Sequence, residues 1–206
     1  MNDLASRLNA VMDAVPAKTA LYCMDLTTGT PIAAIRENTR VVSASTIKVS
    51  ILCCALQDVM DGKLSLDQPL AIAPGDFCSD TEVFEPGYRQ DGASLWEMLY
   101  WMIVSSDNTA TKTVISLLGY DHVNGYCRAI GLTQTSLQRK MLDFQAIAEG
   151  RNNYTSPADL YRVFSRLYHG EILNKPLREV AFDFLSRCRS TDALQRYIPD
   201  AVTVLH

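Results

Sequence analysis

The stretch of residues 41–49 constrains the fold of this chain more than any other. It follows strand-like sequence, and from Ile47 the apolar residues recur at helical spacing as far as Asp61. Ser45 therefore falls in the first turn of a helix, with Ser43 as the expected cap, and Lys48 lies one turn further along on the same face. A lysine so placed can act as a base toward the serine hydroxyl, and the amides of the helix start can help to hold an oxyanion. The stretch predicts a nucleophilic serine at a helix N-terminus.

A second motif, Ser106-Asp107-Asn108, gives this interpretation its weight. The Ser-x-x-Lys spacing alone occurs roughly once per chain of this length and usually marks only a cap and a solvated lysine. An Ser-Asp-Asn tripeptide has only about a few per cent chance of occurring in such a chain. It follows one predicted helix and opens the next, so it lies at a turn. A serine and an asparagine presented from such a turn suit proton relay and amide recognition.

The two motifs, in this order and at this distance, resemble those of the class A β-lactamases and the related penicillin-binding proteins. The flanking sequence agrees: residues 91–99 lead to the second motif as in that family, and Gly29 stands in a strand turn ahead of the nucleophile. The resemblance implies acyl transfer to an amide carbonyl, an acyl-enzyme, and its release by water.

Site residues follow from the resemblance. It implies that Ser45 is the nucleophile and Lys48 the base or proton shuttle. Ser106 is then the proton relay to the leaving nitrogen, and Asn108 contacts the amide side chain of the substrate. Asp107 is expected to be structural, holding its turn.

The residue that drives deacylation is less well defined. In the family an Ω-loop carries an Arg-x-Glu whose glutamate activates water. The matching stretch here, residues 139–144, has Met141 at that position, and a methionine is no base. Asp143 and Glu149 are nearby carboxylates that could substitute, with Asp143 as the first choice. The alternatives are that Asp143 stabilises its loop and that Glu149 is solvated; without a base the acyl-enzyme would persist.

The resemblance also suggests an aromatic contact. Phe84 falls where the family often places an aromatic residue at the rim of the cleft, so it is a candidate substrate-binding residue. The alternative is that Phe84 packs within its own lobe.

The implied fold is α/β (α+β), serine β-lactamase/transpeptidase-like, with an all-helical lobe plus an incomplete antiparallel-sheet lobe. We expect one domain over residues 1–206, with an α/β lobe from 1–40 and 194–206 and an all-helical lobe from 41–193. Residues 202–206 resemble the sequence just before the family's Lys-Thr-Gly motif. We therefore expect the chain to be truncated before that motif. A missing C-terminal segment or a second chain is then a candidate partner that would supply it.

Helix and strand signals fill in this outline. Helices are expected over 3–15, 94–104, 108–119, 121–131, 155–170, 176–188 and 192–197, and strands over 19–26, 31–36 and 201–204. Ser94 and Glu97 form a capping box, Asp121 is an expected cap, and Ser156-Pro157 is a strong helix start.

Composition limits the remaining functions. The net charge of −4 gives no reason to expect nucleic acid or an anionic membrane as partner, and no apolar run reaches a membrane span. The N-terminus has no signal-peptide pattern and the six cysteines form no C-x-x-C, so reduced thiols and a cytoplasmic location are expected, although the family is usually exported. The histidines have no sequence neighbours at ligand spacing, so no metal and no cofactor are expected.

Three functions remain open. The first is a serine β-lactamase acting through a Ser45 acyl-enzyme, with a small-molecule β-lactam as substrate. The second is a penicillin-binding peptidase or esterase that acylates but deacylates poorly, with a peptidoglycan-like peptide as substrate. The third is a catalytically silent binder or fragment.

Overall fold

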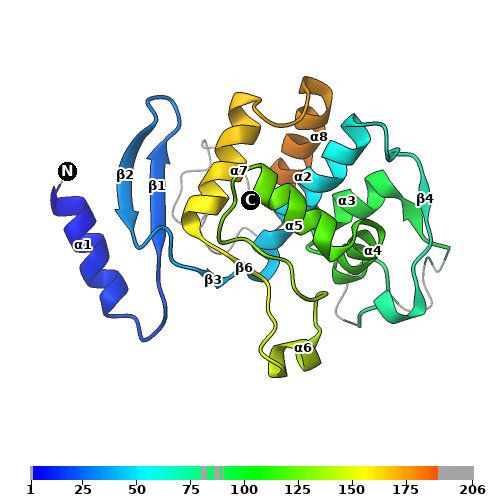
Figure 1. Ribbon diagram of the computed structural model, residues 1–206, viewed down its shortest axis with the longest axis horizontal. Coiled ribbons are helices and arrows are strands. Elements are labelled where there is room, and N and C mark those ends of the chain that lie inside the picture. Colours follow the sequence, from blue (N-terminus) through cyan, green and yellow to red (C-terminus); the bar gives the residue numbers. More distant parts are fainter. Residues whose placement is uncertain (1, 80–82, 86–88, 90, 190–206) are drawn as a thin grey trace.

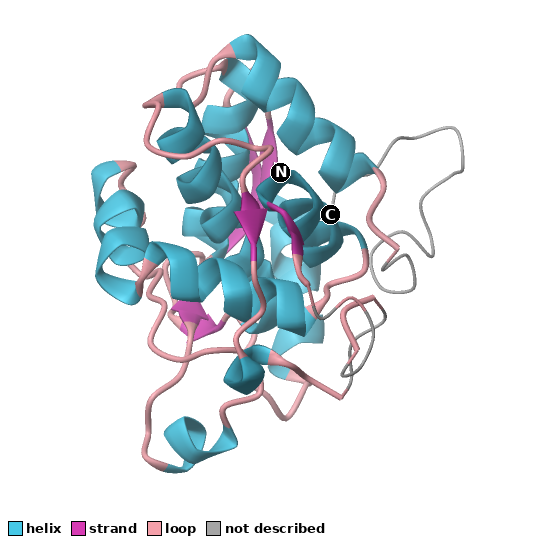
Figure 2. Ribbon diagram, turned by 90° about the vertical axis from the view of Figure 1, so that its right-hand side faces the viewer, coloured by secondary structure: helices cyan, strands magenta, loops and turns pink. Residues whose placement is uncertain are grey.

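The computed structural model describes residues 2–79, 83–85, 89 and 91–189. Helices dominate this part of the chain and the strands are short (Figure 2). The helices are α1 (Asn2–Asp13), α2 (Ile47–Met60), α3 (Leu95–Val104), α4 (Asn108–Leu118), α5 (Tyr120–Ala129), α6 (Phe144–Ala148), α7 (Pro157–His169) and α8 (Lys175–Ser186). The strands are β1 (Leu21–Asp25), β2 (Thr30–Ile35), β3 (Val41–Val42), β4 (Pro69–Leu70), β5 (Ala93–Ser94) and β6 (Tyr154–Thr155), and two 3-10 turns are η1 (Ala44–Thr46) and η2 (Pro74–Asp76).

The N-terminal part is a helix followed by a two-stranded hairpin. β1 and β2 pair antiparallel, and Gly29 takes the positive φ of +68° that the turn between them requires. α1 packs on β2, and β1 packs on α7, where the rings of Tyr22 and Tyr161 meet edge to face at 5.1 Å. Figure 1 shows this unit at one end of the molecule, with α7 between it and the other helices.

Helix α2 is the central element of the helical lobe. Every residue from Ile47 to Leu56 is buried, and the helix packs against α3, α4, α5 and α8. Fully burying a leucine or isoleucine side chain contributes about 1.5–3 kcal/mol to the free energy of folding, so the buried side chains of α2 hold it firmly in the helical lobe. The turn at its N-terminus, which carries Ser45, is therefore attached to a helix that is buried along most of its length.

Two predicted helix starts are confirmed. The Ser94 hydroxyl accepts a 3.2 Å bond from the Glu97 amide, although the Glu97 carboxylate pairs with Arg89 and does not return to Ser94 as a full capping box would. The Ser156 hydroxyl likewise caps α7, whose first residue is Pro157.

Two expected caps are wrong. Ser43 has helical backbone angles (φ −73°, ψ −24°) and makes no side-chain cap, because the chain enters α2 through the η1 turn and not from an extended residue. The cap position of α5 is Gly119, one residue before the helix, so Asp121 lies inside the first turn, where its charge still suits the helix dipole.

Two further pairings complete the fold: β3 pairs with β6, and β4 with β5. The expected combination of a helical lobe and a small antiparallel sheet is confirmed. The expected helix over 192–197 and strand over 201–204 lie outside the described residues, so the expected bounds of the two lobes stay a prediction. Among the described helices none has the length and apolar character that crossing a membrane requires.

Candidate active site

Ser45 is presented by the tight turn η1 at the start of α2. It is exposed, whereas the residues from Ile47 to Leu56 are buried. Ala44 just before it has φ +45°, a left-handed conformation that an alanine adopts only under strain. The backbone therefore turns sharply to bring the Ser45 hydroxyl to the surface above a buried helix.

Lys48 is buried beneath this turn, with 3% of its surface exposed. Its ammonium nitrogen donates to the Ser106 carbonyl at 2.6 Å, to the Ser106 hydroxyl at 2.8 Å and to Asn108 Oδ1 at 3.1 Å. A lysine ammonium has three N–H donors, so these three acceptors can satisfy the charged form in a site with little water.

Ser106 joins Lys48 to Ser45. Its hydroxyl accepts from Lys48 and donates to the Ser45 hydroxyl at 3.0 Å. If Lys48 is neutral, the same chain can run in the opposite direction and carry the Ser45 proton through Ser106 to the lysine nitrogen. The structure thus brings together the predicted nucleophile, relay and base, and Asn108 with them.

The Ser106 backbone is itself strained, with φ +58°. A non-glycine residue in this region costs on the order of 1–2 kcal/mol. The conformation turns both the carbonyl and the hydroxyl of Ser106 toward Lys48.

Asp107 holds this turn in place, as expected. One carboxylate oxygen caps α4 by accepting from the Ala110 amide at 2.8 Å, and the other accepts from the amides of Val83 and Phe84 at 3.2 and 3.3 Å. The side chain is buried, so it ties the loop around residue 84 to the start of α4.

The candidate role of Phe84 as an aromatic at the cleft rim is corrected. Its side chain has 0% exposed surface and belongs to the hydrophobic core of the helical lobe. Its backbone amide, and not its ring, connects it to the site through Asp107.

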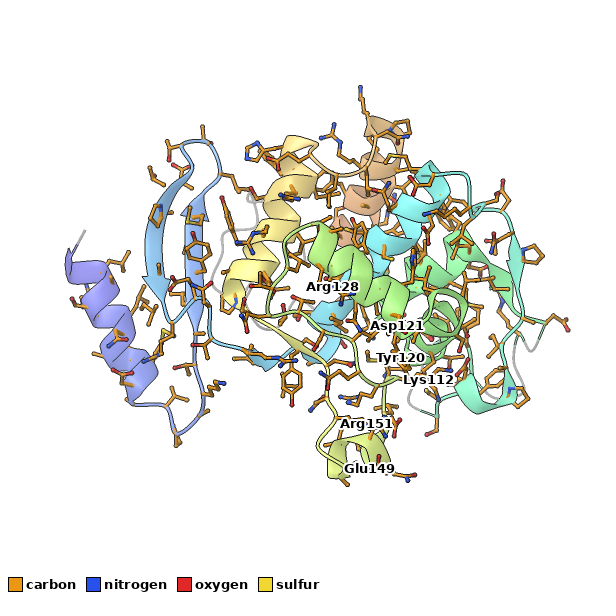
Figure 3. The ribbon with its side chains drawn as sticks, in the orientation of Figure 1. Lys112, Tyr120, Asp121, Arg128, Glu149 and Arg151 are labelled. Atoms are coloured by element: carbon orange, nitrogen blue, oxygen red, sulfur yellow. The ribbon has the colours of Figure 1, made fainter. Side chains whose placement is uncertain are left out.

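The loop between α5 and α7 carries the candidates for deacylation. Met141 is buried in the core cluster with 7% exposure, so the position that matches the family's glutamate holds a packing residue. Asp143 caps α6 by accepting from the Ala146 amide at 2.9 Å. Glu149 is exposed, and hydrogen bonds from Arg151 and Gln145 lower the pKa of its carboxyl group. Figure 3 shows Glu149 and Arg151 together at the outer end of this loop.

Asn153 clamps the base of this loop, a role that the sequence did not reveal. Its side chain accepts from the amides of Gln138 and Arg139 at 2.8 and 3.0 Å and donates to the Arg139 carbonyl at 3.0 Å. Its own carbonyl accepts from the Ser43 amide at 2.9 Å. Asn153 therefore sets the loop directly against the turn that carries the nucleophile. A lone asparagine in a polar loop gives no signal of this.

Lys140 anchors the same loop to the helical lobe. Its ammonium group pairs with the buried carboxylate of Asp76 at 2.5 Å and contacts the hydroxyl of Ser116, which donates to Asp76 at 2.7 Å. The loop is thus fixed at two points, at Asn153 and at Lys140.

One side-chain cluster away from Ser45 has metal-ligating chemistry. Cys54, Asp58 and His122 place their ligand atoms within 4.8 Å of one another. His122 has no sequence neighbour at ligand spacing, but the fold brings Asp58 Oδ2 to 2.6 Å from its Nε2 although 64 residues separate the two.

Comparison with known proteins agrees with this geometry. A solved structure of PBP-A is 25% identical, with a TM-score of 0.90, over 100% of this chain and 76% of that one. An ancestral class A β-lactamase is 25% identical (TM-score 0.87; 97% and 77% of the two chains), and so is a β-lactamase from Xanthomonas campestris (TM-score 0.86; 96% and 74%). These likenesses confirm the expected fold. The model of the β-lactamase enzyme family matches residues 3–206, and the chain belongs to that family of serine hydrolases.

Proposed function

We propose that this protein opens β-lactam rings through an acyl-enzyme on Ser45. The observation that carries the proposal is the hydrogen-bonded series from Lys48 through Ser106 to Ser45, with Asn108 beside it. It joins a surface hydroxyl to a buried nitrogen base, which is the requirement for activating a serine nucleophile.

The steps that form the acyl-enzyme have assigned groups. The Ser45 oxygen attacks the lactam carbonyl, and its proton passes through the Ser106 hydroxyl to a neutral Lys48. The carbon–nitrogen bond of the ring then breaks, and the ring nitrogen takes a proton back from Ser106, which Lys48 replenishes. Water finally cleaves the ester, which frees Ser45 and releases the opened acid.

Two features favour a second candidate, a penicillin-binding enzyme that deacylates slowly. Met141 is buried at the position that matches the family's water-activating glutamate, and Asp143 is engaged as a helix cap. A related structure shows an acyl-enzyme of a PBP-A mutant with penicillin G, so this ligand is a suitable probe for both candidates.

The test is an intact-mass time course with penicillin G, using the parent protein, Ser45→Ala and, as a control for an unrelated surface serine, Ser65→Ala. We expect a single penicilloyl adduct on the parent and on Ser65→Ala and none on Ser45→Ala. A short-lived adduct with penicillin consumed supports the β-lactamase, and a persistent one supports the penicillin-binding enzyme. An adduct that persists in Ser45→Ala, or none on any protein, would refute the proposal.

A further inference from the structure

The packing of α2 on α5 brings together three side chains that the proposed reaction does not use. Cys54 and Asp58 lie four residues apart on α2 and so share one face, and His122 reaches them from the first turn of α5. Cys54 and Asp58 are buried, whereas 44% of the His122 side chain is exposed. The cluster is therefore buried on the side of α2 and open to solvent on the side of His122.

We propose that Cys54, Asp58 and His122 bind a zinc ion between α2 and α5. Tetrahedral zinc with ligand distances of 2.0–2.3 Å needs ligand atoms roughly 3.3–3.8 Å apart. The three ligand atoms already lie within 4.8 Å of one another, and the closest pair, His122 Nε2 and Asp58 Oδ2, is 2.6 Å apart. A small rotation of the half-exposed imidazole opens the space for the ion, and water supplies the fourth ligand.

The donor set selects for zinc. A thiolate and an imidazole suit a borderline-soft ion, whereas calcium and magnesium prefer sites made of oxygen ligands alone. Without metal, burial raises the pKa of the Cys54 thiol to about 12, so the thiol is neutral at physiological pH. Binding of the ion therefore replaces the thiol proton, which is released to solvent.

Charges around the cluster are compatible with a cation. Lys63 donates to Asp58 Oδ1 at 3.1 Å, which leaves Oδ2 to face the histidine and the ion. The same ammonium group pairs with Asp61 at 2.9 Å, so a second carboxylate balances its charge. The Cys54 thiolate and the Asp58 carboxylate together carry two negative charges, which a divalent ion neutralises.

The ion would act as a structural clamp and not as part of the reaction. Cys54 follows Ser45 by nine positions, which is about 14 Å at the helical rise of 1.5 Å per residue. A bond network from α2 to α5 would stabilise the helix that supports the nucleophile, and any ion that binds only the folded state raises the unfolding midpoint.

The test uses Co²⁺ as a spectroscopic probe and Zn²⁺ in competition, on metal-free protein without a histidine tag. We expect one Co²⁺ per chain with a thiolate-to-cobalt charge-transfer band, displacement by one Zn²⁺, and a higher unfolding midpoint with Zn²⁺. Cys54→Ser should abolish the band and weaken Zn²⁺ binding by about 100-fold or more. Cys23→Ser is the matched control because Cys23 is exposed and lies on β1, and it should change neither.

A second variant guards against misfolding of Cys54→Ser. His122→Ala removes a half-exposed ligand and should reduce Zn²⁺ binding while circular dichroism stays unchanged. The proposal is overturned if the parent binds no stoichiometric Co²⁺, if the charge-transfer band survives in Cys54→Ser, or if Cys23→Ser removes it.

Discussion

The Ser106 hydroxyl donates a 3.0 Å hydrogen bond to the Ser45 hydroxyl, although 61 residues separate the two serines. The bond crosses from the turn between α3 and α4 to the turn before α2. Lys48 also contacts the Ser106 hydroxyl, so Ser106 connects the nucleophile Ser45 to its base. Several expectations depend on it.

Removal of this link should slow acylation without unfolding the protein. In Ser106→Ala the Ser45 proton loses the path to Lys48 that runs through Ser106, and since such proton transfer is worth about 10²–10⁴-fold, we expect a fall of at least about 100-fold in the penicillin G acylation rate. Ser105→Ala is the control, because the Ser105 hydroxyl donates to the Trp101 carbonyl of α3 and not to the Lys48–Ser106–Ser45 series. Stopped-flow or quenched mass spectrometry measures the rate, and equal rates for both variants would contradict the relay role.

The strained Ser106 backbone makes a separate prediction about stability. Glycine adopts positive φ without steric cost, so Ser106→Gly should have a higher free energy of unfolding than Ser106→Ala, by about 1 kcal/mol. Both variants lack the hydroxyl, so the comparison isolates the backbone. Urea unfolding measures the difference; a glycine variant less stable than the alanine variant would mean that Ser106 relaxes to another conformation.

Local rules account for what the sequence could predict. The helical period after Ile47 places Lys48 one turn from Ser45. Ser94 and Ser156 each cap a helix by accepting a hydrogen bond from the backbone amide three residues further along the chain. Long-range packing decides the rest. Nothing local shows that Phe84 is drawn into the core, or that Asp58 meets His122.

Long-range packing also decides the route of the proton from Ser45 to Lys48. Sequence spacing suggests that Lys48 acts directly on Ser45, and the fold adds a route through Ser106, whose hydroxyl contacts both groups. That arrangement depends on how α4 packs on α2, which no local pattern fixes.

Asp107 should be a major contributor to stability. Its carboxylate accepts from three backbone amides while buried, so Asp107→Ala leaves those donors unsatisfied and should cost about 2–4 kcal/mol in the free energy of unfolding. Asp121→Ala removes an exposed carboxylate from the first turn of α5 and should cost well under about 1 kcal/mol. Denaturant unfolding compares them, and similar losses would show that the Asp107 contacts contribute little.

Buried thiols should make stability fall at alkaline pH. Burial raises the pKa of Cys53 and Cys54 from 9.0 to about 12, and that of Cys127 to about 11. Above pH 9 the unfolded chain releases these protons while the native chain keeps them, so the free energy of unfolding decreases as pH rises from about 9 toward 12.

A single thiol can be isolated from this trend. Near pH 10.5, with a metal chelator present, Cys54→Ala should make the decline shallower by about 1.4 kcal/mol per pH unit, whereas Cys23→Ala, which removes an exposed thiol, should leave the slope unchanged. Urea titrations at a series of pH values give the slopes. An unchanged slope in Cys54→Ala would show that this thiol already ionises in the folded protein.

Asp143 can be tested with one substitution that separates its two possible roles. Asparagine caps helices as well as aspartate does, so Asp143→Asn should keep the bond to the Ala146 amide and the stability of the loop, while it removes any carboxylate able to activate water. Because Asp143 is engaged as the cap of α6, we expect the lifetime of the penicilloyl adduct to be the same in Asp143→Asn as in the parent. Asp143→Ala, which removes the cap as well, should cost about 1 kcal/mol in stability. A lifetime lengthened by about 100-fold in the asparagine variant, at unchanged stability, would instead make Asp143 the base that replaces the family's glutamate.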